Sequence, residues 1–198
     1  MPRADARITL QRLVETAVAL LDEHGPDALT LSAVARALGV RTPSLYHHVD
    51  GLDGLRLEVR VYGIERLGDA LQRASSGRSG RDALAAVAHA YVTFGRQQPG
   101  LYARTLAGAD DDERVRSAAG RVLDTVLAVL RAYGLEGEAA LHATRFVRSA
   151  LHGFTALERA GGFALPLDRD ASFDHLVDAV DAGLERLATP STRRPPST

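Results

Sequence analysis

Apolar residues recur along this chain at the spacing of amphipathic helices. The first segment has the i, i+3, i+4, i+7 spacing that lays one apolar stripe on an α-helix. Its apolar positions are Leu10, Leu13, Val14, Ala17, Val18 and Leu21. Gly25-Pro26 follows and ends the helix.

Two short helices, joined by a tight turn, are predicted next. The first begins at Thr30, whose hydroxyl can cap the free N–H groups, and ends at Gly39. Thr42-Pro43 opens the second, which runs through Ser44 to Val49, because proline suits the first helical position. A longer helix begins near Leu52.

Five more helices are predicted beyond a loop rich in Ser and Gly at 75–80. Their ranges are 81–96, 99–108, 112–133, 137–160 and 172–188. No convincing strand interrupts them, so the predicted fold class is all-α with about nine helices. We expect three parts: a domain at 1–51, a second helical domain at 52–188, and a disordered tail at 189–198, rich in Pro, Ser, Thr and Arg.

Composition narrows the chemistry that this chain can perform. It has 198 residues, 45% of them hydrophobic, and a formal net charge of −1, which suits a globular protein with a real core. Cysteine is absent and all 24 basic residues are arginine, so disulfides, thiolate nucleophiles, cysteine-ligated metals and lysine bases are excluded. No apolar run reaches the roughly 18 to 20 residues of a membrane helix, and no signal-peptide core follows the first residues. We therefore expect a cytoplasmic protein with no membrane partner.

The outside of the helix at 44–49 carries the most informative chemistry. Its polar side chains, with no acidic residue before Asp50, are Arg41, Thr42, Ser44, Tyr46, His47 and His48. All can donate hydrogen bonds to phosphate oxygens or base edges. On the inside, Ala35 lies four residues before Gly39 and permits close approach of the two helices. The space between these helices is filled by Leu38, Val40 and Leu45. That packing fits a helix-turn-helix, and it also fits a plain corner between two helices of a bundle.

The stretch from Leu29 to Val49, LTLSAVARALGVRTPSLYHHV, resembles the DNA-binding segment of TetR-family transcriptional regulators. The resemblance extends more loosely over about the first 60 residues. Members of this family are all-α homodimers whose N-terminal domain binds a palindromic operator in double-stranded DNA and whose C-terminal helices bind an effector and the second subunit. The resemblance implies the same architecture here, and release of a repressor by a small-molecule effector.

The resemblance also implies roles for single residues. Tyr46 matches the tyrosine of the family's Leu-Tyr-x-His pattern and would contact the DNA backbone; His47 and His48 follow it at positions that often touch phosphates. Base edges would be read where the recognition helix opens, and a guanidinium there could pair with guanine. The residues concerned are Arg41, Thr42, Pro43 and Ser44. Thr30 and Ser32 would meet phosphates from the preceding helix.

Two features of this segment depart from a typical member. Family members commonly carry a lysine near the start of the fourth helix, where this chain has Gly51-Leu52-Asp53, so one phosphate contact is expected to be missing. Residues 1–60 contain seven Arg against eight Asp and Glu. Any positive surface must therefore come from the placement of the arginines. We expect four of them on one side of the domain: Arg3, Arg7, Arg36 and Arg41.

The second half, over roughly 81–187, is similar to the TetR-type effector domain named for a Trp-His-Gly signature. The residues that carry this similarity are Tyr91–Tyr102, Leu151–Glu158 and Gly162-Phe163, with Leu151 in place of the tryptophan. A largely apolar effector is expected to contact Tyr91, Phe94, Tyr102, Phe146, His152 and Phe154. Each of these aromatic residues could equally be a core residue, and His152 could be a structural histidine.

Two helices of the second half, 137–160 and 172–188, carry two apolar faces each. One face can serve the core and the other a second copy, giving a four-helix interface with two-fold symmetry. The predicted interface residues are Phe146, Ala150, Leu157, Val177, Val180 and Leu184. Such symmetry is what a palindromic operator requires.

Other functions find less support in the sequence. The acidic run at 110–113 suits a solvated cap at a helix start better than a cation site, and we expect no metal and no cofactor. A helical enzyme would need a nucleophile or metal cluster in the second half, which we do not find. A helical interaction module would dimerise without salt-dependent DNA binding. The ligand-responsive dimeric regulator is the favoured hypothesis, and it is not an enzyme.

Overall fold

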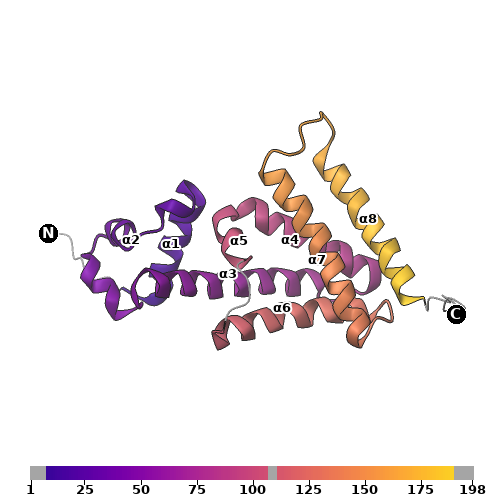
Figure 1. The fold of residues 1–198 in the computed structure, drawn as a ribbon, viewed down its shortest axis with the longest axis horizontal. Helices are drawn as coiled ribbons and strands as arrows, with labels where there is room; N and C mark the ends of the chain where they lie inside the picture. The colour runs from indigo at the N-terminus through magenta and orange to yellow at the C-terminus, as the bar shows by residue number, and fades with distance from the viewer. Residues whose placement is uncertain (1–7, 107–110, 190–198) are drawn as a thin grey trace, which may run out of the picture. The chain divides into compact units, whose positions relative to one another are not determined.

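The computed structural model describes residues 8–106 and 111–189 (Figure 1). The predicted tail lies outside the described residues from position 190 onward, as do Arg3 and Arg7. Within these ranges every regular element is a helix and no strand occurs, which confirms the all-α prediction.

The described residues form eight α-helices and two 3-10 segments. Those of the first half are α1 (Leu10–His24), η1 (Pro26–Ala28), α2 (Leu31–Leu38), η2 (Thr42–His47), α3 (Gly51–Ser75) and α4 (Gly80–Gln97). Those of the second half are α5 (Pro99–Thr105), α6 (Glu113–Arg131), α7 (Gly137–Arg159) and α8 (Arg169–Ala188). Each helix expected from the sequence has a helical counterpart, one of them a 3-10 segment, with ends that differ by a few residues; the end predicted at 108 lies outside the described residues.

Two local differences from the predicted helices occur in the first half. The segment predicted as a two-turn helix at 44–49 is the 3-10 segment η2, whose hydrogen bonds include Ser44 N–H to the Arg41 carbonyl and His48 N–H to the Leu45 carbonyl. The segment is only six residues long, and i→i+3 hydrogen bonds are common in helical pieces of this length, so a 3-10 segment takes the place of the predicted α-helix. The second difference is η1, which the sequence analysis did not anticipate.

The packing of the chain divides it into two units, with boundaries inside α3, α4 and α6. One unit holds the described residues of Met1–Asp69 and Phe94–Gly120, and the other those of Ala70–Thr93 and Arg121–Thr198. The first part of α3 packs in the same unit as the helices before it, and the division predicted at residue 51 stays a prediction.

The core of the first unit is built around α1. This helix packs against η1, α2 and α5, and α2 packs against η2. Among the fully buried apolar side chains of this unit are Leu13, Ala17, Val34, Leu45, Leu55, Val59 and Leu101.

A close approach between α1 and α5 depends on one glycine. A Cβ on Gly100 would lie 2.5 Å from the backbone carbon and oxygen of Leu21, so no larger residue fits without a shift. At the same place Oδ1 of Asp22 accepts the N–H of Gly100 at 2.7 Å and that of Leu101 at 3.3 Å. Asp22 thus satisfies N–H groups at the start of α5 that have no partner within the helix.

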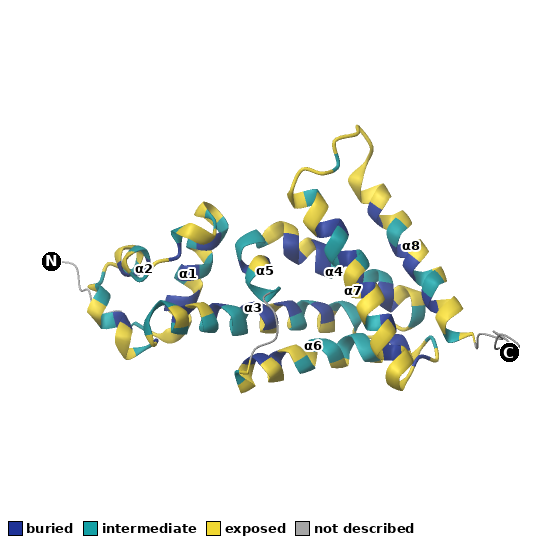
Figure 2. Ribbon diagram, viewed as in Figure 1, coloured by how far each residue is buried: buried dark blue, intermediate teal, exposed yellow. Residues whose placement is uncertain are grey.

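The second unit has its apolar core on α7 and α8, which pack against each other. Three phenylalanine rings form a continuous contact: Phe154 lies 4.9 Å from Phe163 and 4.9 Å from Phe173, measured between ring centroids. The His89 ring meets Phe173 edge-on at 5.1 Å. The segment between α7 and α8 is almost wholly exposed, as the yellow loop in Figure 2 shows.

Polar contacts join α4 and α8 in the second unit. The Arg81 guanidinium pairs with Asp178, and His89 Nε2 lies 3.1 Å from Asp174 Oδ1. The Tyr133 hydroxyl, in the turn after α6, donates to Asp181 at 2.5 Å. Burial, followed by this hydrogen bond to a carboxylate, raises the pKa of Tyr133 well above its usual range.

Candidate nucleic-acid interface

The α2 helix is capped at both ends by the residues that the sequence suggests. At its start the Thr30 Oγ1 accepts the N–H of Ala33 at 3.1 Å and lies 3.1 Å from the Ser32 Oγ. At its end Gly39 has a left-handed backbone, φ 71°, and its N–H bonds to the carbonyls of Ala35 and Arg36. Glycine tolerates this conformation without steric cost, so the chain can turn sharply into η2.

The inner side of the corner between α2 and η2 is packed as predicted. Val34 and Ala35 of α2 and Leu45 of η2 are buried, and Leu38 and Val40 are half-buried. The Val40 N–H bonds back to the Ala35 carbonyl at 3.0 Å, which fixes the turn. The apolar side chains thus hold the outer side of η2 toward solvent.

The outer side of the corner presents the nine predicted DNA-contacting residues, none of which is buried. Tyr46 is the most prominent, at 60% exposed. The exposed members are Thr30, Ser32, Arg41, Pro43, Tyr46 and His47, and the half-buried ones are Thr42, Ser44 and His48. Figure 2 shows the exposed positions of this region in yellow. Their contacts with DNA remain a prediction.

Electrostatically, this surface has few permanent charges. Arg36 and Arg41 are both exposed, and no acidic residue lies in the first turn of α2 or η2. Among the described residues, the side chains of Arg41, His47 and His48 have no hydrogen bond or ion pair. Their donors are therefore available for an anionic ligand.

Comparison with known proteins is decisive for the family. The family model described as "Bacterial regulatory proteins, tetR family" matches residues 13–59, which cover this corner. The model described as "Tetracyclin repressor-like, C-terminal domain" matches residues 84–180. The uncharacterized HTH-type transcriptional regulator Rv0681 of Mycobacterium tuberculosis is 40% identical over 93% of this chain and 85% of its own length. The chain belongs to the TetR family.

Further relatives and solved structures agree with that membership. The HTH-type transcriptional regulator YobS of Bacillus subtilis is 36% identical over 76% of this chain and 78% of its own length. A TetR of Acinetobacter baumannii, solved in complex with minocycline, is 26% identical over 93% of this chain and all of that one, with a TM-score of 0.71. A protein of unknown function from a Rhodococcus species has the same fold, with a TM-score of 0.76 at 23% identity over 93% of this chain and 98% of that one.

TetR-family proteins are regulators of transcription that bind DNA and small-molecule effectors and act as dimers. Within the described residues, no helix of this member is long and apolar enough to cross a membrane.

The six predicted effector-contacting residues do not share one environment. Tyr91, Phe94, Tyr102 and Phe154 are buried, His152 is half-buried and Phe146 is exposed. Phe94 and Tyr102 belong to the first unit, and the other four belong to the second. A site that uses all six stays a prediction.

The six predicted interface residues also divide into two groups. Val177, Val180 and Leu184 are buried inside the chain, because α8 uses this face against its own unit. They have almost no surface to offer a second copy. Phe146 and Leu157 are exposed and Ala150 is half-buried, so these three have surface that a second copy can contact.

Sequence reasoning missed the residues that hold the helices of the first unit in place. Asp22, Gly100 and Arg114 were not singled out, although each makes a contact between helices. Asp22 and Gly100 lie 78 residues apart in the chain, so no local pattern marks the contact. The acidic run did contain a correct signal: the Asp112 carboxylate accepts the Arg114 N–H at 2.8 Å at the start of α6, as a cap should.

Proposed function

We propose that this protein is a dimeric repressor that binds a palindromic operator through α2 and η2 and is released by a small-molecule effector. The exposed outer side of the corner carries the proposal, since there the side chains of Arg41, His47 and His48 have no hydrogen bond or ion pair with another described residue. We also propose that it acts in the cytoplasm, where its operator would lie. Membership of a family of regulators favours this role over catalysis.

Two kinds of DNA contact are assigned to the corner. Arg41, at the start of η2, would pair with the O6 and N7 atoms of a guanine, beside Thr42, Pro43 and Ser44. Tyr46, His47 and His48 would bind phosphates from η2, and Thr30 and Ser32 would bind them from α2. The free N–H groups at the start of α2 add a partial positive charge that favours a phosphate there.

The effector is proposed to bind in the C-terminal domain, of the Trp-His-Gly type, and to be largely apolar. The A. baumannii TetR was solved with minocycline, and ActR of Streptomyces coelicolor with (S)-DNPA. In this chain the aromatic candidates of the second unit are Tyr91, Phe146 and Phe154, with His152 as a polar one. An effector that binds better to an arrangement of the helices that does not fit the operator lowers operator affinity. By linkage, the operator then lowers effector affinity by the same factor.

The dimer is proposed to form through one stripe on each of α7 and α8. On α7 the stripe has the spacing i, i+4, i+7, i+11 and consists of Phe146, Ala150, Gly153 and Leu157. On α8 it consists of Leu176, Ala179, Gly183 and Leu187. The two stripes are contiguous, because the Phe146 ring lies over Gly183, 3.0 Å from where a Cβ would be. Small residues between large apolar ones allow two helix pairs to pack closely.

The test is selection of bound sequences from a random DNA pool by the purified protein. We expect a palindromic site whose affinity falls steeply with salt, because phosphate contacts release counterions. Arg41→Ala should weaken binding by about 1–3 kcal/mol and relax specificity at one base pair, whereas Tyr46→Phe should weaken binding without changing the preferred sequence.

The matched control is Arg73→Ala, which removes the same charge from an exposed position near the end of α3. A folded dimer that enriches no site, or Arg41→Ala and Tyr46→Phe proteins that bind like the parent, would overturn the assignment.

A further inference from the structure

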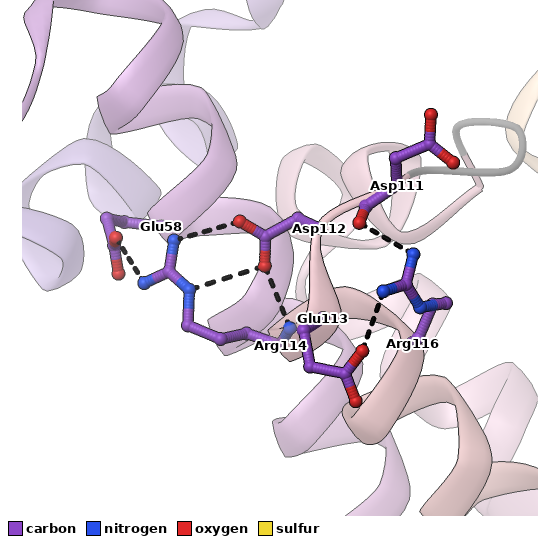
Figure 3. Close-up of polar contacts among 6 residues, drawn as sticks. All are labelled: Glu58, Asp111, Asp112, Glu113, Arg114 and Arg116. Carbon is purple, nitrogen blue, oxygen red and sulfur yellow. Dashed lines mark hydrogen bonds and ion pairs between the residues drawn. The ribbon is translucent and has the colours of Figure 1, made fainter.

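One arginine at the start of α6 reaches out of its own helix. The Arg114 Nη1 donates to the Glu58 Oε1 of α3 at 2.6 Å. Its Nε and Nη2 donate to the two oxygens of Asp112 at 3.3 Å and 3.4 Å. Figure 3 shows the guanidinium between these two carboxylates, all within the first unit.

A second arginine two residues later provides an internal comparison. Arg116 donates to the Asp111 carbonyl at 2.6 Å and to the Glu113 Oε2 at 2.6 Å. The side chains of Arg114 and Arg116 are 49% and 52% exposed, so they differ little in surroundings. The two differ in which elements they contact: Arg116 contacts Asp111 and Glu113 at the start of α6, whereas Arg114 also contacts α3 (Figure 3).

The partners of Arg114 are well placed to make this contact stable. The Glu58 side chain is only 18% exposed, and the Asp112 carboxylate is itself held by the backbone N–H of Arg114. The hydrogen bond from Arg114 is the main cause of a pKa of Asp112 below its usual range, and the hydrogen bond to Glu58 is the main cause of a raised pKa of Arg114. A guanidinium shared by two fixed carboxylates loses less side-chain freedom per contact than an isolated exposed pair.

Glu58 lies near the DNA-binding corner along the chain. The α3 helix begins at Gly51, directly after η2, and Glu58 lies seven residues, about two turns, into it. Val49, two residues after η2, and Leu55 of α3 are both buried, so the chain on either side of the start of α3 packs into the core of the first unit. The α6 helix continues beyond Gly120 into the second unit.

We propose that Arg114 is a positioning residue for operator binding, which fixes the start of α3, and with it η2, against α6 through Glu58. The inference rests on the proposed function. The two DNA-binding corners of a dimer must meet half-sites about one helical turn apart. A corner whose orientation is less restricted spends a smaller fraction of the time in the orientation that fits its half-site. The apparent operator affinity falls in proportion to that fraction.

The experiment compares the parent with Arg114→Gln, Glu58→Gln, the double variant and the matched control Arg116→Gln. Binding is measured to the duplex selected by the parent and to a shuffled duplex of equal length. We expect Arg114→Gln and Glu58→Gln each to weaken operator binding about tenfold, as a fall of the competent fraction to about a tenth requires. The double variant should lose no more than either single one, because both remove one contact. Arg116→Gln should change operator affinity by no more than about twofold. The affinity of each variant for the shuffled duplex should also stay within about twofold of the parent's.

A second measurement does not depend on DNA or on dimerisation. The chain has no cysteine, so spin labels can be placed at two exposed positions of the first unit, Asp27→Cys in η1 and Ala119→Cys in α6, with the labelled chain diluted in unlabelled protein. Arg114→Gln should broaden the distance distribution between the labels, and Arg116→Gln should not. Equal losses for Arg114→Gln and Arg116→Gln, or an unchanged distribution in Arg114→Gln, would overturn the inference. If the parent selects no duplex, the proposed function fails and the label distances alone decide the role of Arg114.

Discussion

The α2–η2 corner and the α7–α8 stripes are the two most informative surfaces of this TetR-family protein, and they differ in chemistry. The corner exposes hydroxyls, imidazoles and Arg41 over an apolar interior. The stripes expose Phe146 and Leu157 among glycines and alanines. A polar surface with open donors suits an anionic ligand, and an apolar surface with small residues suits a second helix pair.

The comparison also shows how glycine can serve different purposes. Gly100 in the first unit meets the backbone of Leu21, which cannot move, whereas Gly183 in the second unit meets a Phe146 ring, which can turn. Gly153, on the α7 stripe, has nothing within 4 Å in the described chain. The first glycine is required by the fold of the monomer, and the last is required only if a second copy packs there.

The largest effect is expected for Gly100→Ala. Its Cβ would force α5 away from α1, so we expect the free energy of unfolding to fall by about 3 kcal/mol, at the upper end of overpacking costs. Chemical denaturation measures the change. Gly120→Ala in α6, where nothing lies within 4 Å, is the control and should leave stability unchanged or raise it. Equal stabilities of the two variants would contradict the close approach of α1 and α5.

Leu157→Asp tests the stripes as an interface between copies. Leu157 is exposed in the chain, so its replacement should leave the fold intact while weakening the dimer by about 2 kcal/mol or more, the size of an interface hot spot. Analytical ultracentrifugation measures the dissociation constant.

Leu141→Asp is the matched control for this test. Leu141 is exposed to a similar degree on α7 but lies outside the stripe, since it is sixteen residues from Leu157 and about 160° around the helix. If the two variants weaken the dimer equally, or neither does, the stripe is not the interface.

Thr30 and Ser32 distinguish folding from binding within the corner. Thr30→Ala removes the cap of α2 and should lower stability by about 1 kcal/mol, in addition to weakening operator binding. Ser32→Ala removes a hydroxyl that accepts no capping N–H, so it should weaken binding and leave the melting temperature unchanged. A melting temperature that falls equally in both variants would show that neither hydroxyl acts mainly through DNA.

Asp112→Asn is expected to have the smallest effect, and its sign depends on pH. The hydrogen bond from Arg114 holds the pKa of Asp112 below its usual range, so the folded state favours the ionised carboxyl. The stabilisation is present above the pKa of about 3.9 expected in the unfolded chain and is lost as pH falls through the lower value of the folded state. Parent and variant should therefore differ in melting temperature at pH 6, and the difference should shrink as pH falls below about 3.9. A difference that does not shrink with falling pH would contradict an ionic role.

The sequence by itself determined the helices and the corner. The apolar spacing, Thr30 and Gly39 at the ends of α2, and the polar run after Gly39 are all local signals, because caps and amphipathic stripes depend on residues within a few positions. The prediction at 44–49 was wrong in helix type, because Thr42-Pro43 marks the start of a helical segment but does not distinguish a short 3-10 segment from an α-helix.

Tertiary structure alone decided which surface each helix uses and what holds the helices together. Val177, Val180 and Leu184 were predicted to face a second copy, but the chain buries them itself, since periodicity does not say which of two apolar faces is inward. The contacts of Asp22 with α5 and of Arg114 with Glu58 join residues 78 and 56 positions apart. Such contacts arise from the packing of whole helices, so no local pattern can reveal them.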